Sequence, residues 1–174
     1  MAFTTTFKSK IDGSASDAFN VDFSIGFGAR GNRPDDIMLA QALFRILHFE
    51  LREVGAQSIP PPSGVTSIAV DGVLGPVTAK CILGVQQRSK SIGMPVLLDG
   101  ILDPFRDQQQ LSTVAHVRYA LEILNDTAFV FCKRAGVDNY TSLPRRTDVP
   151  RALTSALQQR RQSARQYQKG LSPA

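Results

Sequence analysis

The residues that could carry acid–base chemistry are few in this chain. Glu50 and Glu53 are one helical turn apart, a spacing typical of a solvated helix face. A glycosidase instead places its two carboxylates on opposite sides of the scissile bond. His48 and His116 are the only two histidines, and neither accompanies a recognisable serine or cysteine nucleophile motif. We therefore predict a protein without catalytic residues, and a lysozyme-like activity is the enzymatic alternative.

Metal and cofactor sites are disfavoured in the same way. Two cysteines, Cys81 and Cys132, cannot build a Cys-rich zinc site, and both fall on apolar helix faces typical of buried, unreactive thiols. The segment Gly26-Phe27-Gly28-Ala29-Arg30-Gly31 matches the spacing of a dinucleotide-binding loop. That loop needs its third glycine inside the opening helix, whereas Asn32-Arg33-Pro34 delays the helix here. We expect a flexible glycine turn, no cofactor and no metal.

Apolar periodicity predicts the elements that position these residues. Alternation of Val21, Phe23, Ile25 and Phe27 indicates a strand, and Phe3 to Phe7 is a weaker second candidate beyond Asp12-Gly13-Ser14. Helices are predicted at about 34–48, 76–88, 107–134 and 149–169. We expect Asn125-Asp126-Thr127 to kink or divide the third of these helices. The fold class is therefore mainly α, with a short N-terminal β-like arm.

The most informative motif is a turn that leads into the second predicted helix. It reads Asp71-Gly72-Val73-Leu74-Gly75-Pro76-Val77-Thr78. Asp71 can accept hydrogen bonds from the following amides, Gly72 can adopt a positive φ, and Pro76 suits a first helical turn. We expect Gly75 to permit a close approach and Thr78 to bridge the first helical turn to the Asp71 turn. The later Asp99-Gly100-Ile101-Leu102-Asp103-Pro104 echoes this motif, although no repeat extends over the whole chain.

These residues resemble the small helical peptidoglycan-binding domains of bacterial wall hydrolases. The resemblance covers roughly residues 33–106 and includes Leu39-Ala40-Gln41-Ala42-Leu43, the Asp-Gly-x-x-Gly-Pro-x-Thr turn, and Ile82, Val85 and Gln86. Val85 stands where the family has Phe, the loop from Arg52 to Ser67 is long, and Asp103 replaces a glycine of the second turn. The resemblance implies a compact helical domain with a ligand groove beside the turn and two helices. Its implied binding residues are Asp71, Gln86 and Arg88, and its structural residues are Gln41, Asp71, Gly72, Gly75, Pro76, Thr78, Asp99 and Gly100.

Positive charge gathers at the end of the chain. The formal net charge is +5, and residues 141–174 alone carry seven basic residues against Asp148. With its many glutamines, this segment predicts a basic C-terminal helix that is solvated or docked on a partner. Tyr167 is its only aromatic residue beyond Thr141, which disfavours base stacking, so nucleic acid is not the expected partner. No apolar run approaches the roughly 20 residues that span a bilayer, so we expect no membrane span.

Together these features predict three segments. They are an arm at 1–33, a helical peptidoglycan-binding-like domain at 34–135, and a linker with a basic helix at 136–174. The function implied is non-catalytic peptidoglycan binding, within a phage or a secretion or injection apparatus. The alternative is a structural or adaptor subunit of such an assembly that contacts other protein subunits. The N-terminal residues lack the pattern of a signal peptide, so we expect synthesis in the cytoplasm and a virion-associated or other non-classical route to the wall.

Overall fold

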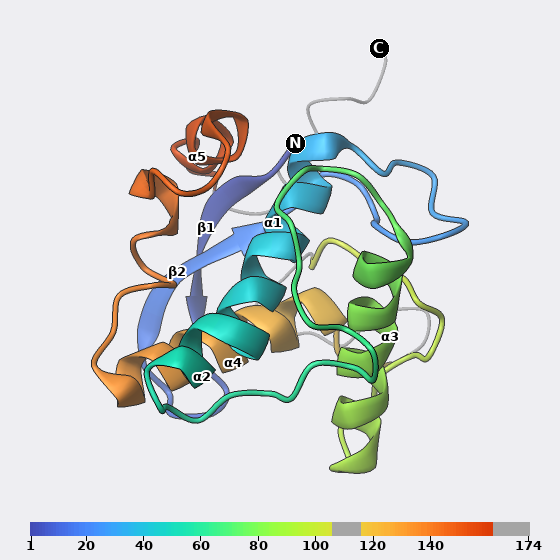
Figure 1. Ribbon diagram of the computed structural model, residues 1–174, viewed down its shortest axis with the longest axis horizontal. Coiled ribbons are helices and arrows are strands. Elements are labelled where there is room, and N and C mark those ends of the chain that lie inside the picture. The colour runs from blue at the N-terminus through green and yellow to red at the C-terminus, as the bar shows by residue number, and fades with distance from the viewer. Residues whose placement is uncertain (106–115, 162–174) are drawn as a thin grey trace.

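The computed structural model describes residues 1–105 and 116–161, and its helices surround one central helix (Figure 1). It is 41% helical and 10% strand, so the chain is mainly α-helical, as its periodicity predicts. The described helices include none that is both long and apolar enough to cross a membrane.

The central helix is α1 (Pro34–Arg45), which packs against α3 (Pro76–Ser91), α4 (Ala120–Ala135) and α5 (Arg151–Leu157). It continues through a π-helical turn, η1 (Ile46–Glu50), into α2 (Leu51–Glu53). Helix α3 (Pro76–Ser91) lies beside α1 in Figure 1. Both α1 and α3 start with proline in the first turn, where its fixed φ fits and its missing N–H is not needed. The first two predicted helices are thus confirmed.

The third predicted helix is shorter at its start and is not divided. Its residues 107–115 lie outside the described residues, the segment 116–119 is not helical, and α4 runs over Ala120–Ala135. The expected break at Asn125 is wrong, because its side chain bonds both the Leu121 carbonyl one turn earlier in α4, at 2.8 Å, and a strand beside the helix. Its Oδ1 accepts from the backbone N–H of Phe19 at 2.8 Å, and its Nδ2 donates to the carbonyl of Phe19 at 2.9 Å. An asparagine that would interrupt an isolated helix therefore fastens α4 to a strand.

The sheet is a two-stranded antiparallel hairpin of β1 (Phe3–Lys8) and β2 (Ala15–Asn20). Its register runs from Phe3 opposite Asn20 to Lys8 opposite Ala15. The weaker strand candidate, Phe3 to Phe7, is therefore a strand of the sheet, and the strand predicted at 21–27 is wrong. Residues 22 and 23 form a bend, Gly26 has a φ of +151°, and only Ile25 makes a bridge, to Leu102. Local alternation misled because only Val21 and Ile25 are buried, whereas Phe23 and Phe27 on the same side of the pattern are exposed.

The predicted C-terminal basic helix is also corrected. Helix α5 covers only Arg151–Leu157, and residues 162–174 lie outside the described residues. After α5 the backbone runs beside β1, where Thr4 N–H donates to the Gln159 carbonyl at 2.8 Å and Arg161 N–H donates to the Thr4 carbonyl at 2.9 Å. This strand-like pairing replaces the helical hydrogen bonds that a longer α5 would need.

One hydrophobic cluster joins all three predicted segments. Phe19 from the N-terminal hairpin, Leu43 from α1, Leu124 from α4 and Leu157 from α5 are buried within it. Tyr140 is fully buried and stacks at a tilt against Phe19, with ring centroids 4.9 Å apart. The hairpin and the residues up to α5 therefore complete the core of the central helices.

Candidate functional site

Gln41 holds the turn that precedes α3 with both ends of its side-chain amide. Its Oε1 accepts from the backbone N–H groups of Asp71 at 3.0 Å and Gly72 at 2.9 Å. Its Nε2 donates to Asp71 Oδ1 at 2.8 Å and to the Val73 carbonyl at 3.1 Å. Gln41 is buried on α1, so this loop is fixed to the centre of the molecule. We call this arrangement the first clamp.

The other residues of the motif differ in what they contribute to the first clamp. Gly72 has a φ of +74°, and a Cβ there would lie 2.9 Å from the Pro34 carbonyl oxygen, so the glycine is required. Gly75 has an extended φ of −104°, and a Cβ there would meet nothing within 4 Å, so the expected close approach at Gly75 is wrong. Thr78 accepts from Gln41 Nε2 at 3.2 Å and is thereby linked to the turn through that glutamine.

Gln86 forms a second clamp of the same design on the turn at Asp99-Gly100. Its Oε1 accepts from the Gly100 N–H, and its Nε2 donates to Asp99 Oδ1 and to the Ile101 carbonyl, all at 2.9 Å. The two echoing sequences are thus structurally equivalent turns, each gripped by a buried glutamine of an earlier helix. Gly26 packs tightly on this turn, because a Cβ there would lie 2.3 Å from the Gly100 carbonyl oxygen. That contact gives the glycine-rich segment at 26–31 a packing role.

The three candidate binding residues therefore do not form one cluster. Asp71 belongs to the first clamp, where hydrogen bonds from the Val73 N–H and from Gln41 hold its pKa below its ordinary value. Gln86 belongs to the second clamp and is buried. Arg88 is exposed, and its guanidinium has no hydrogen bond or ion pair with any described residue. Of the three side chains, that of Arg88 is the one with none of its polar atoms bonded to the described part of the chain.

Arg88 lies at an open hollow of about 450 Å³ beside the C-terminal half of α3. We call it the Arg88 hollow; its lining is His48, Ile59, Pro60, Pro62, Ser63, Gly84, Gln87, Arg88 and Ser91. One wall is α3, and the other is the proline-rich loop that follows α2. The sequence predicted Arg88 but missed Ser63, Gln87 and Ser91. The signal available for Ser91 was its position three residues after Arg88 on the same helix.

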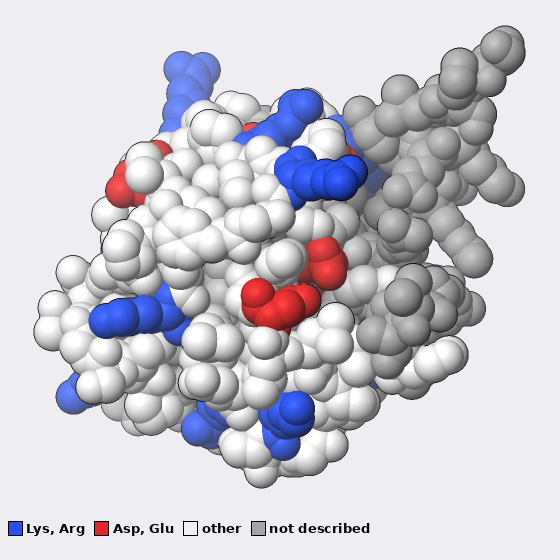
Figure 2. Space-filling view, turned by 90° about the vertical axis from the view of Figure 1, so that its right-hand side faces the viewer, with Lys and Arg blue, Asp and Glu red and all other residues white. Residues whose placement is uncertain are grey.

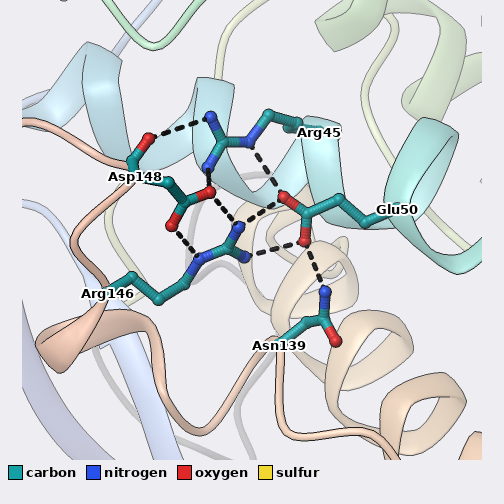
Figure 3. Close-up of polar contacts among 5 residues, drawn as sticks. All are labelled: Arg45, Glu50, Asn139, Arg146 and Asp148. Carbon is teal, nitrogen blue, oxygen red and sulfur yellow. Dashed lines mark hydrogen bonds and ion pairs between the residues drawn. The ribbon is translucent and has the colours of Figure 1, made fainter.

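The carboxylate of Glu50 is held in an ion network at the end of the π-helical turn (Figure 3). Arg146 donates to Glu50 Oε1 and Oε2 at 2.7 Å each, and Asn139 donates to Oε2 at 2.7 Å. Arg45 and Asp148 complete the network. Burial alone would raise the pKa of Glu50, but the hydrogen bonds from Arg146 and Asn139 outweigh it and lower that pKa. A carboxylate so stabilised is a poor proton donor, and Glu53 lies exposed outside this network.

The remaining reactive side chains are buried or apart from one another. Burial lowers the pKa of His48, whose Nδ1 lies 2.9 Å from the Ile59 carbonyl, whereas His116 is exposed before α4. Burial raises the pKa of Cys81 and of Cys132 to about 11, so both thiols stay protonated near neutral pH. Within residues 1–105 and 116–161, no group of three or more His, Cys, Asp or Glu is placed to hold a metal ion.

Basic side chains do not form one continuous surface on the face that carries α3. Figure 2 shows them separated by uncharged surface around a small acidic group. The described basic residues at the end of the chain are matched by acids of the hairpin segment: Arg160 pairs with Asp17 and Arg161 with Asp22, both at 2.7 Å. These pairs leave less unneutralised charge for a polyanion than the sequence alone indicates.

Comparison of the chain with models of known families, with curated proteins and with solved structures gave no match. The functional argument therefore depends on the geometry of the clamps and of the Arg88 hollow.

Proposed function

We propose that this protein is a non-catalytic peptidoglycan-binding module that uses the Arg88 hollow. The observation that carries the proposal is the unpaired guanidinium of Arg88 in an open hollow between α3 and the proline-rich loop. A guanidinium binds carboxylates with two parallel hydrogen bonds, and the peptide stems of the wall polymer carry free carboxylates.

The other lining groups suit the same ligand. Ser63, Ser91 and Gln87 supply hydroxyl and amide groups for the amides of a peptide stem and an amino sugar. Pro60 and Pro62 offer a rigid apolar wall that loses little conformational entropy when a ligand packs on it. The two clamps fix the turns before and after α3, so the helix that forms one wall of the hollow is held in place before a ligand arrives.

The test is co-sedimentation of the full chain with purified sacculi at low and high salt. Full-length protein is needed, because both the N-terminal hairpin and α5 contribute to the core. We expect salt-resistant pelleting that Arg88→Gln and Ser63→Trp reduce. Arg52→Gln is the matched control, since Arg52 is exposed on α2 and does not line the hollow.

Pelleting that disappears at high salt would show only the attraction of a basic chain to an anionic polymer. Absence of pelleting, or equal pelleting by Arg88→Gln and Arg52→Gln, would refute the proposal. The same fold would then serve protein–protein contacts as a structural or adaptor subunit.

A further inference from the structure

A second cavity lies between α3 and α4 and is distinct from the Arg88 hollow in its chemistry. Its volume is about 300 Å³. Aliphatic and aromatic side chains form most of its wall, among them Leu47, Val85, Met94, Ile123, Leu124 and Phe131. Small-molecule sites in proteins are cavities of this size or larger, mostly apolar, with a few polar groups that orient the ligand. We call it the apolar cavity.

The charge at the apolar cavity is positive. Arg88 lines both this cavity and the Arg88 hollow, and no described residue neutralises its guanidinium. No Asp or Glu is among the described residues that line the apolar cavity. An apolar volume with one unpaired cation at its boundary favours a ligand that has an apolar body and one anionic group.

The volume sets the scale of that ligand. An apolar cavity of about 150 Å³ already binds benzene. The present cavity has room for a hydrocarbon body about twice that size. Arg88 is suited to a carboxylate, which it can bind with two hydrogen bonds.

We propose that the apolar cavity binds a monocarboxylic acid with an apolar body, such as a medium-chain fatty acid. The hydrocarbon lies between α3 and α4, and the carboxylate is bound by Arg88. This inference does not depend on wall binding, because only Arg88 and Ile59 are shared between the two sets of lining residues.

The test uses decanoate below its micellar concentration, with decanol and decyltrimethylammonium as probes of the same chain length. Isothermal titration calorimetry on the full chain measures the affinities. We expect decanoate to bind best and Arg88→Gln to weaken it by about 10- to 100-fold, to the level of decanol, because a charged hydrogen bond is lost. Arg52→Gln should leave decanoate binding unchanged.

Filling the cavity provides the second arm of the test. Thr127→Phe on α4 and Ser89→Phe on α3 each place a ring in the cavity from opposite walls, so either one suffices if the other fails to fold. Both should abolish binding of decanoate and of decanol. Leu83→Phe is the control, because Leu83 is exposed on α3 and does not line the cavity.

Absence of decanoate binding, equal binding of decanoate and decyltrimethylammonium, or decanoate binding that survives in folded Thr127→Phe and Ser89→Phe would each overturn the inference. The two proposals fail separately. Thr127→Phe should still pellet with sacculi, and Ser63→Trp should still bind decanoate.

Discussion

Replacement of Gln41 by leucine tests whether the first clamp stabilises the fold. The substitution keeps the size of the side chain and removes every hydrogen bond from Gln41 to the turn. The N–H of Gly72 is buried and loses its partner, which costs about 1–3 kcal/mol. The two bonds with Asp71 lie at the surface and contribute about 0.5–1.5 kcal/mol each. We expect Gln41→Leu to lower the free energy of unfolding by about 3 kcal/mol, or the melting temperature by about 6–12 °C for a chain of this length.

Urea denaturation followed by far-UV circular dichroism measures this loss. Gln87→Leu is the matched control, because Gln87 is exposed on α3 and should change stability by less than about 0.5 kcal/mol. Gln41→Glu adds a sharper test, since it places a second carboxylate beside Asp71 Oδ1, where Nε2 now lies at 2.8 Å. Its stability should fall as pH rises and the new group ionises. A loss for Gln41→Leu below about 1 kcal/mol, or equal to that of Gln87→Leu, would refute the clamp as a source of stability.

Three further substitutions test other parts of the fold by the same unfolding assay. Burial raises the pKa of Asp36 to about 6, so the folded carboxyl binds its proton more tightly than the unfolded one, and its contribution to stability falls as pH rises from about 4 to 6. The stability of wild type relative to Asp36→Asn should fall by about 3 kcal/mol over that range; a constant difference would contradict this. Arg146→Met leaves the half-buried carboxylate of Glu50 with fewer partners and should lower the free energy of unfolding by about 2 kcal/mol. Arg145→Met is the control, because Arg145 is exposed, and a similar loss there would argue against the ion network. Gly72→Ala should destabilise the fold by at least about 1–2 kcal/mol and Gly75→Ala by much less, because only Gly72 has a positive φ. Equal losses would show that the φ of Gly72 does not determine the cost.

The helices were predictable where their signals are local. Pro34 and Pro76 mark the starts of α1 and α3 because a proline in the first turn needs no distant partner. The end of α5 was not predictable in this way. Residues 159–161 leave the helix to pair with Thr4, which is more than 150 positions earlier in the chain, and no local pattern encodes that partner.

The candidate site was predicted in part for the same reason. The motif identified Asp71 and Gly72 as a turn, but the partner of Gln86 depends on how the loop after α3 folds back. The echo between the two Asp-Gly sequences was the available signal for a second clamp. The Arg88 hollow was harder to foresee, because its proline wall comes from a loop more than 20 residues away.

Side-chain amides account for much of the order in the loops. Besides the two glutamine clamps, Asn20 bonds both the N–H and the carbonyl of Phe105, Asn32 does the same for Gly26, and Asn125 for Phe19. Each amide thus satisfies a donor and an acceptor of the backbone at once, in loops at Phe105 and Gly26 and in strand β2 at Phe19. This explains how long loops keep a fixed path with only one described two-stranded sheet.

The amide clamps also bear on function. A neutral amide stays un-ionised over the ordinary pH range, so the loops around α3 should keep their shape where carboxylate-held loops would loosen. Residues that hold the backbone in this way have their polar atoms occupied, as Gln41 and Gln86 show. A substitution of either should therefore weaken ligand binding only together with stability. Arg88 has no such structural role in the described part of the chain, so Arg88→Gln should weaken binding while the free energy of unfolding stays unchanged. That separation is what distinguishes a ligand-binding side chain from one that shapes the fold.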